Sequence, residues 1–293
     1  MIENVIQKLL SENALLSEVL CKYDGAPAVF YGDVPNAQDE CWEDGCHPRI
    51  YFGVDWTKEQ ERKVAGTMML NIFCNNESDM LPEDIAETIK TDLSEVFLKD
   101  DTMYCMVWER TDGFEMSGEE PKEIGVTMTF SVLDFTAVTL GVPCPIKGTM
   151  EYLKENVPEV SVIGMDSFDQ IHKLTDDEAV TFVRLASESA DKRQSYSVRW
   201  FDTVMHIHVI AKSHVMRMRY ISKINRLLEM DQEVILEDKS PMFVEKISVS
   251  AGADMLKVGQ ITINGRYGIL RKDPEDPILM NATVTERRMA DGT

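Results

Sequence analysis

Hydrophobic and polar positions follow a pattern that occurs twice along the chain. Period-two alternation predicts a strand, and a recurrence near every 3.6 residues predicts a helix. The first occurrence has strand-like runs at Arg49–Val54, Met68–Phe73, Tyr104–Trp108 and Gly125–Val132, with a predicted helix at Pro82–Leu98. The second has strand-like runs at Val180–Leu185, Val204–Ile210, Phe243–Val249 and Val258–Gly265, with a predicted helix at Ser213–Glu229. Both read strand, strand, helix, strand, strand, and matching points lie roughly 130–140 residues apart, about the length of one small domain.

The repeat predicts an α+β fold with two tandem domains, each an antiparallel or mixed sheet with helices packed on it. Residues 1–140 form the first predicted domain and residues 149–280 the second. Residues 141–148 contain two prolines and two glycines, a composition typical of a linker. Residues 281–293 are predicted to be a flexible tail.

Other segments complete the predicted order of elements. An apolar stripe predicts one amino-terminal helix over Ile2–Leu20, and a shorter helix is predicted at Thr149–Asn156. A short strand is predicted at Ala28–Tyr31, and one long strand at Ile124–Thr139. Ser167–Glu178 is predicted to be a solvated, capped turn.

The net charge of −21 is concentrated in the first half of the chain. Residues 1–145 hold 28 Asp and Glu against 10 Lys and Arg, and residues 146–293 hold 23 against 20. An acidic surface repels phosphates, so sequence-specific DNA binding is not expected of the first half. The chain has no apolar run long enough to span a membrane and no apparent secretory signal, which favours the cytosol and reduced thiols.

The two predicted central helices carry opposite charges on their polar faces. The first has the acidic residues Glu83, Asp84, Glu87, Asp92 and Glu95, and the second has the basic residues Arg217, Arg219, Lys223 and Arg226. Opposite charges on two surfaces speed and orient association, so these nine residues are candidates for a contact between subunits. The plain alternative is that both are solvated helix faces.

Two groups of residues have the chemistry of metal ligands. Cys41, Cys46 and His47 lie in an acidic loop, and His206 and His208 share one face of a predicted strand. Each group lacks the further ligands that a closed zinc site needs. The sequence also lacks a phosphate-binding loop, a dinucleotide fingerprint, an HExxH helix and a nucleophile elbow. We therefore expect no enzyme activity, no metal and no cofactor, with a metal-dependent enzyme kept as an alternative.

Three segments carry a resemblance to a known family: Ala28–Pro35, Pro48–Gly53, and Thr67–Phe73 followed by the acidic helix. In their order, residues 1 to about 135 resemble the tail terminator (tail completion) proteins of long-tailed phages, and the second half resembles them by pattern. The resemblance implies a hexameric ring that caps the tail tube, joins it to head completion proteins and surrounds the channel for DNA. This chain is about twice as long as the family pattern, so three chains would supply six domains.

The resemblance implies a structural component of the virion tail or neck, present in the host cytoplasm during assembly. Its expected partners are copies of itself, as a trimer or hexamer, and other phage tail or neck proteins, with DNA only as passing cargo and no membrane. A baseplate hub or tail tube adaptor is an alternative with the same kind of symmetry. An acidic inhibitor that imitates DNA is a further alternative.

Overall fold

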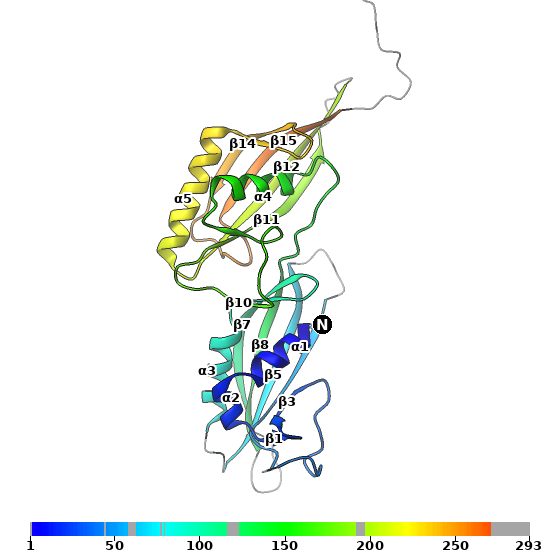
Figure 1. Cartoon of the computed structure of the whole chain (residues 1–293), viewed down its shortest axis with the longest axis vertical. Helices are drawn as coiled ribbons and strands as arrows, with labels where there is room; N and C mark the ends of the chain where they lie inside the picture. Colours follow the sequence, from blue (N-terminus) through cyan, green and yellow to red (C-terminus); the bar gives the residue numbers. More distant parts are fainter. Residues whose placement is uncertain are drawn as a thin grey trace, which may run out of the picture.

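The computed structural model describes residues 2–43, 45–57, 63–76, 78, 80–115, 123–191 and 197–270. Two units follow each other along the long axis of the molecule, and each is a curled sheet with helices packed on it (Figure 1). The predicted α+β class with two tandem sheet-and-helix units is confirmed. None of the described helices is both long enough and apolar enough to cross a membrane.

The amino-terminal unit runs from the first helix to the end of the eighth strand. Its helices are α1 (Ile2–Ser11), α2 (Ala14–Val19) and α3 (Pro82–Leu93). Its strands are β1 (Lys22–Tyr23), β2 (Ala26–Pro27), β3 (Val29–Tyr31), β4 (Arg49–Trp56), β5 (Val64–Asn75), β6 (Val96–Lys99), β7 (Met103–Glu115) and β8 (Glu123–Asp134). The main sheet has the order β6-β7-β8-β5-β4-β3, with β3 parallel to β4 and the other pairs antiparallel.

The carboxy-terminal unit repeats this arrangement. Its helices are α4 (Pro145–Asn156) and α5 (His214–Asp231). Its strands are β9 (Ser161–Val162), β11 (Val180–Ala190), β12 (Val198–Ile210), β13 (Glu233–Ile235), β14 (Pro241–Val249) and β15 (Ile261–Leu270). The sheet order is β13-β14-β15-β12-β11-β9, and β9 is the parallel strand. Strand for strand, this is the order and direction of the amino-terminal sheet.

Each sheet buries one face against its own helices. The alternation in β5 places Met68, Leu70 and Ile72 in a core shared with α1 and α3. In the carboxy-terminal unit, Met205, Ile207 and Val209 of β12 face α4 and α5 in the same way. Period-two burial against one helical layer therefore explains the strand pattern in both halves.

A third cluster of buried side chains joins the two units. It contains Phe97, Met103, Cys105, Leu133, Phe135, Ile163, Phe168, Leu174, Val180, Phe182, Ile210 and Leu256. A further short strand, β10 (Ile171–Lys173), follows α4 in sequence but pairs with β6 at the edge of the amino-terminal sheet. The segment Ser167–Glu178, predicted as a solvated turn, thus contains a strand that ties the second unit to the first.

The predicted helix Pro82–Leu98 is too long by five residues, because α3 ends at Leu93. Glu95 adopts a left-handed backbone conformation with φ of 60°, and its N–H donates to the carbonyl of Met106. Val96, Phe97 and Leu98 are then all buried, between the amino-terminal core and the junction. Burial on both sides suits a strand, so this apolar run forms β6.

Two other predicted boundaries are also corrected. The predicted helix Ile2–Leu20 is two helices, since Asn13 caps α2 by accepting a hydrogen bond from the backbone N–H of Leu16 at 2.8 Å. The predicted linker 141–148 ends early, because Pro145 occupies the first turn of α4, where its missing N–H is not needed. The predicted tail 281–293, and residues 271–280 of the predicted second domain, lie outside the described residues.

Candidate assembly surfaces

The acidic residues of α3 lie mostly on its solvent side. Glu83, Asp84 and Glu87 are exposed, and so is Glu95 just beyond the helix. Asp92 is different, because its carboxylate accepts a hydrogen bond from Asn13 and an ion pair from Lys173 at 3.3 Å. Asp92 therefore holds parts of its own chain together. Glu87 pairs with Lys90 of the same helix at 3.4 Å on the helix surface, and Glu83, Asp84 and Glu95 face solvent.

The basic residues of α5 divide in a similar way. Arg219 and Arg226 are exposed. Lys223 pairs with Glu159, and Arg217 donates to the carbonyl of Ala211 at 3.3 Å. Within the described part of the chain, the predicted basic face is thus reduced to the two exposed arginines, Arg219 and Arg226.

The helices α3 and α5 occupy equivalent places in the two units. Each follows the long strand at the centre of its sheet, β5 or β12, and precedes the hairpin that begins with β6 or β13. One duplicated element therefore presents carboxylates in one unit and guanidinium groups in the other. A head-to-tail assembly can use such a pair of unlike surfaces.

The cysteines of the acidic loop do not gather around one point. Cys41 is exposed, and a hydrogen bond from its thiol to the carboxylate of Asp39 is the main cause of the raised pKa of the thiol. Cys46 faces His47 instead, with 3.4 Å between Sγ and Nδ1. Across the described part of the chain, no group of three or more His, Cys, Asp or Glu is placed to hold a metal ion.

The two histidines of β12 each have a separate protein partner. His206 Nδ1 lies 3.0 Å from the hydroxyl of Thr262, and His208 Nδ1 donates to the carbonyl of Met255 at 2.8 Å. His208 is fully buried at the junction, and burial lowers its pKa to about 4. Burial also lowers the pKa of His206. Both rings are therefore neutral near pH 7 and serve as structural groups of the sheet.

Several residues of the junction are not indicated by any pattern in the sequence. Phe135 lies against Phe97 and Phe182, with ring centroids 5.3 and 5.1 Å apart. Arg184 donates to the carbonyl of Asp134 at 2.6 Å. These contacts depend on how the second unit lies on the first, which local patterns do not encode.

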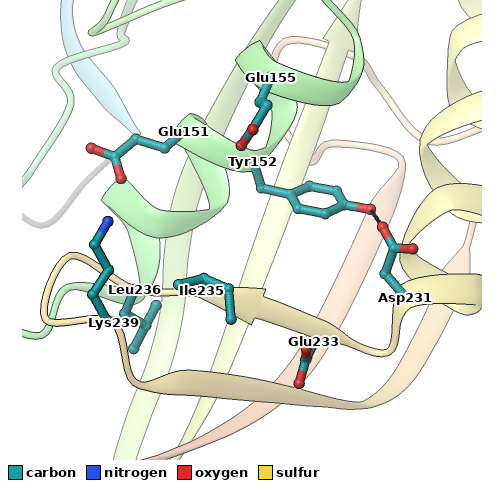
Figure 2. Close-up of a pocket in the computed structure, with 8 residues that line it drawn as sticks. All are labelled: Glu151, Tyr152, Glu155, Asp231, Glu233, Ile235, Leu236 and Lys239. Atoms are coloured by element: carbon teal, nitrogen blue, oxygen red, sulfur yellow. Dashed lines mark hydrogen bonds between the residues drawn. The ribbon is translucent and has the colours of Figure 1, made fainter.

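A surface cleft of about 370 Å³ opens between α4 and β13 of the carboxy-terminal unit (Figure 2). The carboxylates of Glu151, Glu155, Asp231 and Glu233 line it, with Lys239 as the one cation among the lining residues. Tyr152 donates to Asp231 at 2.5 Å across the cleft. Its acidic lining favours contact with cationic groups and disfavours phosphate.

Comparison of the sequence with models of known protein families and with curated proteins finds no match.

Proposed function

We propose that the chain is a non-enzymatic structural subunit of a ring in a phage or phage-like particle, at the head-proximal end of the tail. The observation that carries this proposal is the tandem repeat of one topology, with unlike charges on its two equivalent helices. Three chains then supply six similar units. In the particle, the ring joins the tail tube to head completion proteins, and DNA passes through it without being bound.

The contact between the units inside one chain offers a template for the contact between chains. The strands β8 and β15 are equivalent, since Phe130 and Gly265 each lie opposite the bulge of the neighbouring strand. By that alignment Phe135 corresponds to Leu270, 135 residues later. Phe135 is fully buried against the second unit, whereas Leu270 is 73% exposed. In the proposed ring, Leu270 packs against the amino-terminal unit of the next copy.

The exposed charges orient the same contact. The carboxylates of Glu83 and Glu87 attract Arg219 and Arg226 of a neighbouring copy before the apolar groups meet. Charges of this kind act mainly on the rate and direction of association, and the buried apolar group provides more of the affinity.

Native mass spectrometry of the purified protein tests the proposal. We expect a trimer, and we expect Leu270→Asp to shift it to the monomer. Val142→Asp is the matched control, because Val142 is 68% exposed and lies in the segment before α4, outside both charged helices. A monomer that persists at high concentration, also when tail tubes are added, contradicts the proposal.

Charge reversal tests the direction of the contact. The double variants Glu83→Lys with Glu87→Lys, and Arg219→Glu with Arg226→Glu, should each assemble more slowly alone, and a mixture of the two should recover. Recovery requires that the acidic face of one copy meets the basic face of another. If both double variants assemble as fast as the unaltered protein, these four residues are solvated and take no part in the contact.

A further inference from the structure

Three side chains form a line of hydrogen bonds at the end of the amino-terminal unit that faces away from the junction. Cys46 Sγ lies 3.4 Å from Nδ1 of His47, and Nε2 of the same ring lies 3.1 Å from Oε1 of Glu123. Cys46 and His47 belong to the segment before β4, and Glu123 begins β8. A thiol, an imidazole and a carboxylate in this order are the parts of an activated nucleophile.

The carboxylate end of this line is held firmly. Glu123 lies opposite Asn75 on β5 and also accepts a hydrogen bond from Arg49 at 2.9 Å. Arg49 in turn donates to the carbonyl of Cys46 at 3.2 Å and lies over the ring of Phe73. Arg49 therefore fixes both the loop that carries the thiol and the carboxylate that orients the imidazole.

The imidazole of this line borders open space. A surface cavity of about 660 Å³ is lined by His47 together with Cys21, Asn75, Ser78 and other residues of the loop and of α2, whereas Cys46 is not among its lining residues. Cys46 is partly exposed, whereas Cys21, Cys74, Cys105 and Cys144 are buried. Burial raises the pKa of the Cys21 thiol to about 12, which leaves it unreactive.

We propose that Cys46 is a nucleophilic thiol that exchanges with low-molecular-weight disulfides, with His47 as its base and Glu123 as the residue that positions His47. His47 Nδ1 accepts the thiol proton while Sγ attacks one sulfur of the disulfide. The disulfide bond of the reactant breaks as the new bond to Cys46 forms. The leaving thiolate takes the proton from His47, so atoms, electrons and charge balance without a further oxidant. This inference concerns the unassembled chain, because in the proposed ring Leu270 of the next copy would meet the same end of the amino-terminal unit.

Cys41 provides an internal comparison in the same loop. It is more exposed than Cys46, but its partner is the carboxylate of Asp39, which opposes loss of the thiol proton. Exposure alone predicts faster modification of Cys41, and the hydrogen-bonded line predicts faster modification of Cys46. The two explanations therefore predict opposite orders of reactivity for Cys41 and Cys46 in the same sample.

The test treats the full-length protein, in its monomeric fraction, with oxidised glutathione at one neutral pH and follows the adduct on each cysteine-containing peptide by mass spectrometry. We expect Cys46 to react about tenfold faster than Cys41 or more, since a positioned base contributes at least this factor. His47→Asn should lower the rate at Cys46 to that of Cys41 and leave Cys41 unchanged. Glu123→Gln should lower the rate at Cys46 by a smaller factor, and a reducing thiol should remove every adduct.

Equal or faster reaction at Cys41 in the unaltered protein would overturn the proposal, and this ratio needs no variant. An unchanged rate at Cys46 in His47→Asn would overturn it too, and would leave the three side chains the role of fixing the loop. If His47→Asn also changes the rate at Cys41, the loop has been disturbed. The ratio measured in the unaltered protein, repeated with iodoacetamide, then decides.

Discussion

The two units share one scaffold and differ in what covers one end of the sheet. Equivalent positions follow from the shared strand order and from bulges at Trp108/Arg110 and Val244/Lys246. They place Asn71 opposite Thr127 in the first unit and His206 opposite Thr262 in the second. Both pairs are hydrogen-bonded, at 2.6 and 3.0 Å. The duplication has thus kept a polar cross-strand pair while replacing one of its members.

Two residues further along these strands the units diverge. Phe73 of the first unit has Arg49 over its ring, at a partly exposed end of the sheet. At the equivalent place in the second unit, His208 is buried beside Phe182 and Phe135. One end has become an apolar seal between units, and the other carries a polar line of side chains. Substitution of a few side chains has therefore given the equivalent ends of the two sheets different roles.

The largest effect on stability is expected at the junction between the two units. Phe135→Ala removes a fully buried ring that contacts Phe97, Phe182 and His208. We expect a loss of about 3–5 kcal/mol in the free energy of unfolding, because a cavity of this size is not refilled. Since the ring joins the two units, calorimetry should also show their transitions separating.

Phe73→Ala is the control, because Phe73 lies at the other end of the same sheet, away from the junction. Phe73 is partly exposed and contacts Phe114 within its own unit. We expect a smaller loss and one cooperative transition. An equal loss from both variants would mean that the junction is not the difference between the two ends.

A second, smaller effect is expected from His208 in acid. Burial is the main cause of its low pKa, and the nearby cations Arg184, Lys63 and His206 lower the pKa further, against the bond to Met255 that raises it. Its folded pKa of about 4 lies below the ordinary 6.5, so between these values the unfolded chain binds a proton that the folded chain does not. Stability is therefore lost as the pH falls through this window, by up to on the order of 3 kcal/mol.

His208→Gln separates this titration from the others. The glutamine can still donate to the carbonyl of Met255 but takes up no proton. Urea unfolding at several pH values should show a shallower fall in stability between pH 6.5 and about 4 in the variant, by up to about 1.4 kcal/mol for each pH unit. Parallel curves for both proteins would assign the acid sensitivity to other groups.

The sequence predicts the repeat well because each strand buries one face against its own helices. Alternation in β5 and β12 reflects that burial directly, so strand positions and the fold class could be derived. The opposite charges of the two central helices could be predicted as well, because each helix buries one face and keeps its polar face outside. The side chains Asp92 and Lys223 could not be separated from the rest, since their partners, Lys173 and Glu159, lie far away in the sequence.

The remaining features depend on contacts between distant segments. Val96–Leu98 reads as a continuation of α3 until the second unit supplies the other side of its burial. His47 and Glu123 are 76 residues apart, and only the sheet register brings them together. Spacing rules describe one element at a time, so they do not reveal a side-chain line that is built from two.

The smallest effect is expected at β10, the short strand that the second unit contributes to the amino-terminal sheet. Lys173 of β10 donates to the carbonyl of Thr91 at 2.8 Å and pairs with Asp92, at the end of α3. Both charges are partly exposed, so Lys173→Ala should cost at most about 1 kcal/mol. Hydrogen exchange is the sensitive measurement, because β10 has only three residues and should open locally before the sheet does. We expect faster exchange in β10 and unchanged exchange in β12. A change in exchange that spreads to β12 would mean that β10, and not the ring of Phe135, holds the two units together.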